Sequence, residues 1–555
     1  MNTNLREREH RNIGEDVYEY FQSLTDRVTG GEFQNVSFLS FDSSEPPCPI
    51  GQGQFTRLKL TDNSCQITSF ENSFIQLEIE TNLTFNFSEI SQDFIPDAPI
   101  GTTVRKLPIL FVGFKSGLHA IDHYRFYNSF HAGPLCEQSQ AIYESALTYM
   151  TKSEEEITNK IQRYAYSEEI DKYKEDIPGV IITYGDLIDM KKDNRYTKTI
   201  RFKVNIPYDD FAPLQFFKNY PNSICGDLQL EFKINNNKNM VQYNFNLGDM
   251  FDFVSRTLTK QEIKDLSIDL NKNGYSFGDF CSALQNKSKQ SFTNLGDTGI
   301  FEDITMGQIS DYKFVCKNIH EITVRAGGLL LKTAKSFINC YNIPHDTHEQ
   351  LRDLLSSTKI YIPAQRIDQY TFSQTPTVSS MNCNTTQSLV NCSALAFTWP
   401  RSPNELTCSV NPYMSSIQLQ IDNKTYPDKP FSTYSTEHAS YILGNLMFDD
   451  FFSPNKSLER SLVTNREYKD NTNYLFVVSL ERLDSSPFVF EGLTKDNCYI
   501  TLNGTFDGTY QPYSSLDTRQ NPIMFVCQDT LWELSAGDIN YYYNDKSIIP
   551  RITNN

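Results

Sequence analysis

One segment of the chain, KQEIKDLSIDLNKNGYSFGDF, carries oxygen-bearing side chains at the spacing of a calcium-binding loop. Asp269, Asn271 and Asn273 occupy alternate positions and a glycine follows, as at the start of an EF-hand loop. The closing glutamate is missing, because position twelve is Phe280 and Asp279 would serve only in a loop one residue shorter. An Asx-type turn after a short helix is the simpler interpretation. We therefore predict no metal or other cofactor, with these aspartates and asparagines as weak calcium candidates.

A second group of metal-ligating residue types lies in CYNIPHDTHEQ. The side chains of Cys340, His345 and His348 are of types that bind zinc, but the sequence shows no fourth ligand. A polar loop before a helix explains the segment more simply. The phosphate-binding pattern GxxxxGK[ST], the zinc pattern HExxH and the nucleophile pattern GxSxG do not occur in the sequence. We therefore predict no catalytic residue and no enzyme activity, and a metal enzyme built on this cysteine and these histidines stays an alternative.

The composition limits the classes of partner. The 555 residues carry a formal net charge of −18, which argues against a general nucleic-acid binder because such proteins need a basic face. The stretch MNTNLREREHRNIGEDVYEY lacks the apolar part of a secretion signal, and no apolar run approaches the ~20 residues of a membrane helix. We expect a protein that is not secreted and has no transmembrane segment. Its twelve cysteines, none in a CxxC pair, are expected to be reduced thiols.

Alternating apolar and polar residues predict a mainly β protein. In LQLEFKI, Leu228, Leu230, Phe232 and Ile234 share one phase while the residues between them are polar, as in a strand with one buried face. The longer run FIQLEIETNLTFNF at 74–87 alternates in the same way. Short strands bounded by Pro, Asn, Asp or Gly return in the last third of the chain, which is typical of a sandwich or barrel.

The distribution of these strands predicts two β-blocks in tandem. The predicted segments are an N-terminal arm at 1–31, a first β-block at 32–236, a mixed connector at 237–355, a second β-block at 356–550 and a tail at 551–555. Helical periodicity occurs in loops and in the connector, so helices are expected there as insertions. The long irregular connections are candidates for functional surfaces.

A family resemblance rests on the segment NIPYDDFAPLQFFKNYPNSICGDLQLEFKI. It resembles a block that ends the first jelly roll of double jelly-roll major capsid proteins, above all those of Polinton/Maverick elements in the adenovirus and tailless-phage capsid lineage. The positions that carry the resemblance are Ile206, Pro207, Phe211, Pro221, Asn222, Gly226, Asp227 and Leu228. Further likenesses, such as IYIPAQRIDQYTF and DTLWELSAGDINYYYN, follow in the family's order between about residues 100 and 545.

The resemblance implies a structural protein. Two eight-stranded jelly rolls would stand side by side, and three copies would form a pseudo-hexagonal capsomer of an icosahedral virus or virus-like mobile element. The implied partners are copies of the chain, neighbouring capsomers and minor or penton capsid proteins, without sequence-specific nucleic-acid binding. The implied location is the virion, after synthesis in the cytoplasm or nucleus of a host. The alternative is an intracellular or surface β-sandwich module that binds a carbohydrate or protein ligand.

Overall fold

The computed structural model confirms a mainly β chain built from antiparallel sheets. It describes residues 15–26, 37–42, 48–61, 64–85, 108–139, 177–183, 197–244, 324–373, 379–399, 411–433, 474–480, 492–506 and 522–543, with a few single positions between them. None of the helices in these ranges is long and apolar enough to cross a membrane.

The largest sheet of the first β-region is organised around one long strand, β4. Its strands are β1 (Ser37–Asp42), β14 (Leu330–Tyr341), β4 (Ile67–Phe85) and β10 (Asn219–Tyr220), with β9 (Thr197–Pro207) and β13 (Val324–Ala326) paired to β4 and β2 (Ile50–Gly51) paired to β14. The alternation predicted along β4 is confirmed, since Ile75, Leu77, Ile79 and Leu83 are all fully buried. These side chains form one wall of the first core.

Two smaller sheets complete the first β-region. One contains β3 (Phe55–Lys59), β11 (Leu228–Ile234), β6 (Ile121–Asn128) and β7 (Cys136–Ser139), and the other contains β12 (Val241–Asn244), β5 (Pro108–Gly113) and β8 (Gly179–Thr183). The apolar phase of β11 is buried and its polar phase is partly exposed, as predicted. On the polar face, Glu231 receives a hydrogen bond from Arg57, and the guanidinium of Arg57 lies 4.3 Å from the ring centre of Tyr127. This alternation directs the apolar side of the sheet to the first core.

The second β-region is one hydrogen-bonded sheet that bends around its own core. Its strands are β15 (Ile360–Thr371), β21 (Ile523–Ser535), β16 (Ser380–Thr398), β20 (Leu493–Phe506), β17 (Met414–Ile421) and β18 (Lys424–Phe431), with β19 (Phe476–Ser479) on β16 and β22 (Asp538–Tyr542) on β21. The first half of β16 pairs with β20, and its second half pairs with β21 and β19. Register shifts and a positive φ at Asn391 mark the bend. A strand that bends at bulges can thereby pass from one layer of a sandwich to the other.

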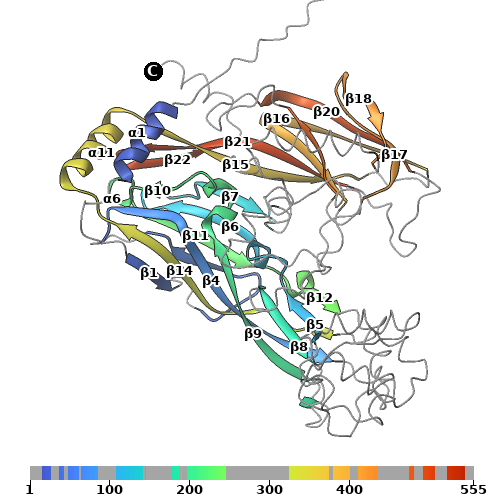
Figure 1. Cartoon of the computed structure of the whole chain (residues 1–555), viewed down its shortest axis with the longest axis horizontal. Coiled ribbons are helices and arrows are strands. Elements are labelled where there is room, and N and C mark those ends of the chain that lie inside the picture. Colours follow the sequence, from blue (N-terminus) through green and yellow to red (C-terminus); the bar gives the residue numbers. More distant parts are fainter. Residues whose placement is uncertain are drawn as a thin grey trace, which may run out of the picture.

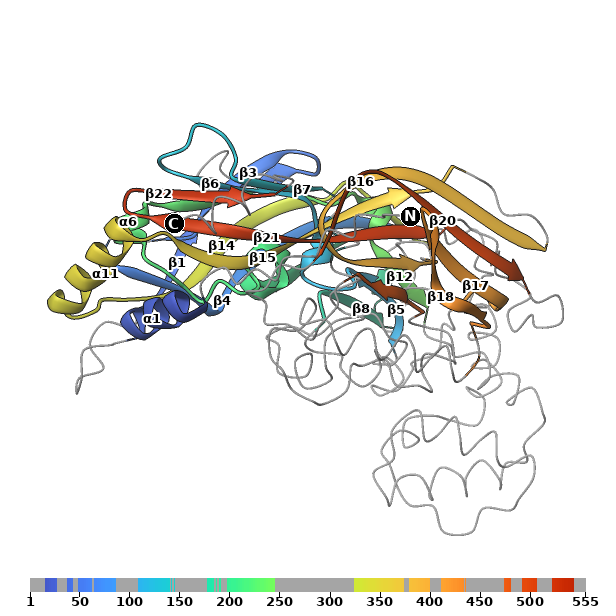
Figure 2. The same ribbon diagram turned by 90° about the horizontal axis from the view of Figure 1, so that it is seen from above.

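The two β-regions share strands. Ile360, Ile362 and Trp532 belong to the first core. Met524 of β21 belongs to the second core, Tyr370 of β15 packs against it, and Phe372, one residue after β15, is part of it. Figure 1 shows β15 and β21 running from the helical end of the molecule to β16 and β20, and Figure 2 shows the same course from above. The two regions are therefore joined by paired strands. The predicted block boundaries stay a prediction, although β14, from the predicted connector, pairs along β4 in the first region.

Three α-helices among the described residues lie together at one end of the molecule (Figure 1). They are α1 (Glu15–Thr25), α6 (Asn222–Cys225) and α11 (His345–Ser357). Phe21 and Leu24 of α1 and Leu351 and Leu355 of α11 are buried in the first core, and α1 lies against α11 and β15 (Figure 1). Residues 15–25, within the predicted N-terminal arm, are therefore packed onto the body of the protein.

Candidate functional site at the junction of the two β-regions

The family-motif residues begin at the end of β9 and enter the first core directly. Ile206 and Phe211 are fully buried, and Pro207 ends the strand. The ring of Phe211 lies edge-on to Tyr124 at 4.9 Å and to Phe126 at 6.0 Å between ring centres. Edge-to-face contacts of this kind add to the free energy of burial. Phe211 therefore holds the chain against the sheet that contains β6, while Ile206 and Pro207 pair with β4.

The next motif residues form a turn between β10 and β11. Pro221 is buried at the start of α6, and the Asn222 side chain is 5% exposed. The Asn222 amide nitrogen donates to the Cys65 carbonyl at 2.8 Å, and Thr68 donates to the amide oxygen at 3.2 Å. A buried amide with both ends satisfied fixes the turn against the start of β4, because leaving either end unpaired would cost free energy.

Gly226 follows this turn with a backbone conformation that excludes other residues. Its φ is +83°, and an added Cβ would lie 2.3 Å from the ring of Phe130 and 2.8 Å from the Ser129 hydroxyl. The next residue, Asp227, accepts a hydrogen bond from Thr61 at 3.1 Å. Buried Leu228 donates its N–H to the same Thr61 hydroxyl at 3.1 Å. The positive φ therefore favours glycine, and an added Cβ would also have to displace the exposed ring of Phe130.

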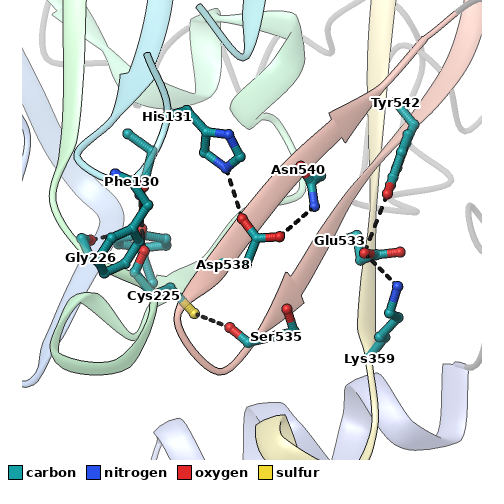
Figure 3. Close-up of polar contacts among 12 residues, drawn as sticks. Phe130, His131, Cys225, Gly226, Lys359, Glu533, Ser535, Asp538, Asn540 and Tyr542 are labelled. Carbon is teal, nitrogen blue, oxygen red and sulfur yellow. Dashed lines mark hydrogen bonds and ion pairs between the residues drawn. The ribbon is translucent and has the colours of Figure 1, made fainter. Parts of the chain in front are cut away.

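The turn between β21 and β22 contacts α6, which directly precedes Gly226, and we call Gly226 and its flanking residues the glycine corner. The Gly537 N–H donates to the Ile224 carbonyl at 3.1 Å, and the Ala536 N–H donates to the Leu355 carbonyl at 3.0 Å. The Cys225 thiol points to the Ser535 carbonyl at 3.6 Å, as Figure 3 shows. The C-terminal hairpin is therefore hydrogen-bonded to α6 and to α11 of the first region.

A polar chain of three residues lies beside this turn. One nitrogen of the His131 ring lies 2.8 Å from an Asp538 carboxylate oxygen, and Asn540 donates to the other oxygen at 2.9 Å (Figure 3). The Asp538 side chain is 44% exposed, so solvent screens the pair and its contribution to stability is small. Nearby, Glu533 accepts from Lys359 at 2.9 Å and from Tyr542 at 3.3 Å.

Trp532 forms the apolar centre of the junction. It is fully buried, and its indole N–H donates to the Pro213 carbonyl at 2.6 Å. Its ring centre lies 4.7 Å from that of Tyr541, 5.9 Å from that of Phe217 and 6.4 Å from that of Phe126. A buried tryptophan whose N–H is hydrogen-bonded removes a large apolar area from water without leaving a polar group unpaired, which stabilises the packing around it. We name Trp532, the β21–β22 turn and the corner at Gly226 the junction site.

A buried carboxyl lies close to the junction site. Glu144 is 1% exposed; the Tyr124 hydroxyl lies 2.9 Å from both of its oxygens, and the Ala212 N–H donates to it at 2.7 Å. Burial raises the pKa of Glu144 to about 8, and the negative charge of Asp210 adds to this rise. The two hydrogen bonds lower the pKa but do not outweigh burial. Glu144 is therefore largely protonated at neutral pH.

The predicted metal candidates have different outcomes. Asp269, Asn271, Asn273 and Asp279 lie outside the described residues. Cys340, His345 and His348 are not assembled into one site. The Cys340 sulfur faces Cys65, His345 lies 3.5 Å from Glu349, and His348 lies 3.0 Å from the Ser223 hydroxyl. Within the ranges that the structure describes, no group of three His, Cys, Asp or Glu side chains could hold a metal ion.

Sequence reasoning missed the junction site as a site. Trp532 and the Ala536-Gly537 turn entered the sequence analysis only as part of DTLWELSAGDINYYYN, a segment that carries the family resemblance. The signals available were the rarity of tryptophan, with two in the chain, and the small residues of a tight hairpin. Neither signal identifies the partner surface, since Pro213 lies 319 residues earlier in the chain.

Comparisons with known proteins find similarity at the level of structure alone. No family model and no curated protein matches the chain. The mavirus major capsid protein is similar at 8% identity and a TM-score of 0.46, over 95% of this chain and 93% of that one. The Sputnik virophage structure is similar at 11% identity and 0.44, over 95% and 92%, and the Faustovirus major capsid protein at 8% and 0.42, over 92% of both chains. At these values the likeness by itself assigns the chain to no family.

Proposed function

We propose that this chain is a major capsid protein of the double jelly-roll type, resembling those of Polinton/Maverick elements. Three copies would form a pseudo-hexagonal capsomer of an icosahedral shell. The observation that carries the proposal is the junction site, which joins two β-regions through shared strands and a buried tryptophan. Each chain has two β-regions, so three chains around a three-fold axis present six similar β-regions. This arrangement needs a fixed angle between the two regions of each chain, which a flexible link would not provide.

The family-motif residues support the same proposal. Asn222 and Gly226 fix the conformation of the chain around α6, to which the β21–β22 turn is hydrogen-bonded. Phe211 packs against Phe126, which in turn contacts Trp532. These three of the residues that carry the sequence resemblance therefore lie beside the place where the two regions meet. Their proposed role is structural: they set the angle between the two lobes.

The proposed partners are further copies of this chain and, at the shell vertices, minor capsid proteins. A three-fold oligomer uses heterologous contacts, in which one side of a subunit meets a different side of the next. Three chains at −18 each carry a formal charge of −54 per trimer, so like charges repel and assembly should strengthen as salt screens them. The proposed location is the virion.

Light scattering on the purified full chain, across protein and salt concentrations, tests the proposal. We expect a stable species near three times 63.9 kDa, or larger shells, and hollow particles by electron microscopy at higher salt. A well-folded monomer at every concentration would overturn the capsomer. Carbohydrate binding by that monomer, measured on a glycan array, would establish the β-sandwich binding module in its place.

A further inference from the structure

Two cysteine sulfurs lie face to face at the start of β4. Cys65 lies two residues before the strand, Cys340 lies near the end of β14, and their sulfur atoms are 2.8 Å apart. Cys65 is 7% exposed and Cys340 is fully buried. A disulfide bond is about 2.05 Å long, so the two sulfurs need to approach by only about 0.8 Å to form one.

The main chain around the two cysteines is held by side-chain hydrogen bonds. The Gln66 N–H donates to the Asn342 side chain at 2.9 Å, and the Ile343 N–H donates to the Gln66 side chain at 2.9 Å. The Asn222 amide nitrogen donates to the Cys65 carbonyl at 2.8 Å. Three hydrogen bonds thus hold the segment before β4 against the segment after β14 and against α6, and they keep the sulfurs in register.

Other cysteines in the described part of the chain have different surroundings. The sulfurs of Cys225 and Cys392 point to main-chain oxygens at 3.6 and 3.4 Å, and the sulfur of Cys498 lies 3.6 Å from the Asp422 carboxylate. A close approach of two sulfurs is therefore not a general consequence of the chain's cysteine content. It belongs to the place where β4 begins and β14 ends.

We propose that Cys65 and Cys340 form a site of oxidative cross-linking, whose co-reactant is a small-molecule disulfide. Cys65, which neighbours exposed Ser64, attacks the reagent as a thiolate and becomes a mixed disulfide while one thiol leaves. The Cys340 thiolate then attacks the Cys65 sulfur, and the second thiol leaves. The two cysteines lose two protons and two electrons, and the reagent disulfide gains both as two thiols.

The cross-link would join residues 275 positions apart in the chain. It would tie the start of β4 to the strand from which the chain passes through α11 into β15. A bond across so long a loop restricts the unfolded chain strongly. The pair would stay reduced in a reducing cytosol and close after the protein reaches an oxidising environment. The site goes beyond the proposed function, since a monomer would form it as readily as a capsomer.

The test is to incubate the folded full chain with excess oxidised glutathione, unfold it in denaturant with iodoacetamide to block every free thiol, and map the peptides by mass spectrometry. We expect a peptide pair joined through Cys65 and Cys340, and a Tm roughly 3–5 °C above that of the reduced chain. C65S and C340S should lose both the peptide pair and the rise. C383S removes a buried cysteine of the second core and should keep both.

Alkylation of both thiols when the oxidised chain is unfolded would overturn the site, and so would a cross-link from either residue to a different cysteine. The wild-type peptide map decides between these results even if a serine variant fails to fold. Assembly state does not enter the measurement, so failure of the cross-link and failure of the capsomer are distinguishable.

Discussion

The two β-regions differ in what their cores enclose. The first buries Lys115, His119, Glu144 and Asp210, each at most 5% exposed. Among the described residues from 360 onward, Glu533 is the one buried acidic or basic side chain, and it directly follows Trp532 on β21. Burying an ionisable group makes the free energy of folding depend on pH, whereas an apolar core depends mainly on packing. The stability of the first region should therefore respond to pH more than that of the second.

Truncating the junction tryptophan should give the largest effect. W532A removes a fully buried side chain that is in contact with both regions, and we expect a loss of about 3–5 kcal/mol in the free energy of unfolding. Urea denaturation followed by circular dichroism measures it. W532F, which keeps an aromatic ring but loses the hydrogen bond to Pro213, should lose less.

The same substitution tests whether the two regions are separate units. The chain has two tryptophans, so in W532F the fluorescence reports Trp399 in the second core, and in W399F it reports Trp532. Because β15 and β21 belong to both cores, we expect each variant's fluorescence midpoint in urea to coincide with its own midpoint by circular dichroism. A separate transition of the second region would contradict the shared-strand interpretation.

The pH dependence of the first region should be the next largest effect. The pKa of Glu144 is raised from 4.5 to about 8 in the folded state. The preference of the folded state for the protonated carboxyl therefore adds fully to the free energy of unfolding below pH 4.5, the pKa in the unfolded chain. That contribution is lost as pH rises through the folded pKa. We expect wild type to lose roughly 2–3 kcal/mol between about pH 6 and about pH 9, and E144Q to show a flatter profile. Equal slopes in urea titrations of the two proteins would remove Glu144 as the cause.

The glycine corner should show a smaller effect. G226A places a Cβ at positive φ and against Phe130, and we expect a loss of about 1–3 kcal/mol. G133A, in the loop that follows β6, has no neighbour within 4 Å and no positive φ, so its stability should stay close to wild type. Thermal unfolding of the two variants gives the comparison, and a G133A loss as large as that of G226A would rule out the local explanation.

The His131–Asp538 contact should give the smallest effect. Both side chains are partly exposed, so a double-mutant cycle with H131A and D538N should yield a coupling of about 0.2–1 kcal/mol. Added salt screens the charge of the partly exposed Asp538 carboxylate, so the coupling should not rise with salt. A coupling above that range that does not respond to salt would place the pair among the main determinants of the junction.

Local pattern was enough to predict the strands but not the way they meet. The alternation in β11 and β4 identified their buried faces because the side-chain period of a strand is two residues. The residues of β14, LLKTAKSFINCY, were predicted to lie in a connector. Their sequence does not indicate that they pair with β4, as they do in the structure. The junction site was missed for the same reason: its contacts join Trp532 to Pro213 and His131 to Asp538 across hundreds of residues.

The sequence by itself determined the β class, the buried faces of β4 and β11, the acidic charge and the glycine at position 226. These are local properties, set by the side-chain period and by the backbone freedom of single residues. Only the tertiary structure decided that β15 and β21 serve two cores, that Glu144 is buried and that Cys65 faces Cys340. Strand alternation specifies a face but not a partner, so such pairings arise when distant segments pack together.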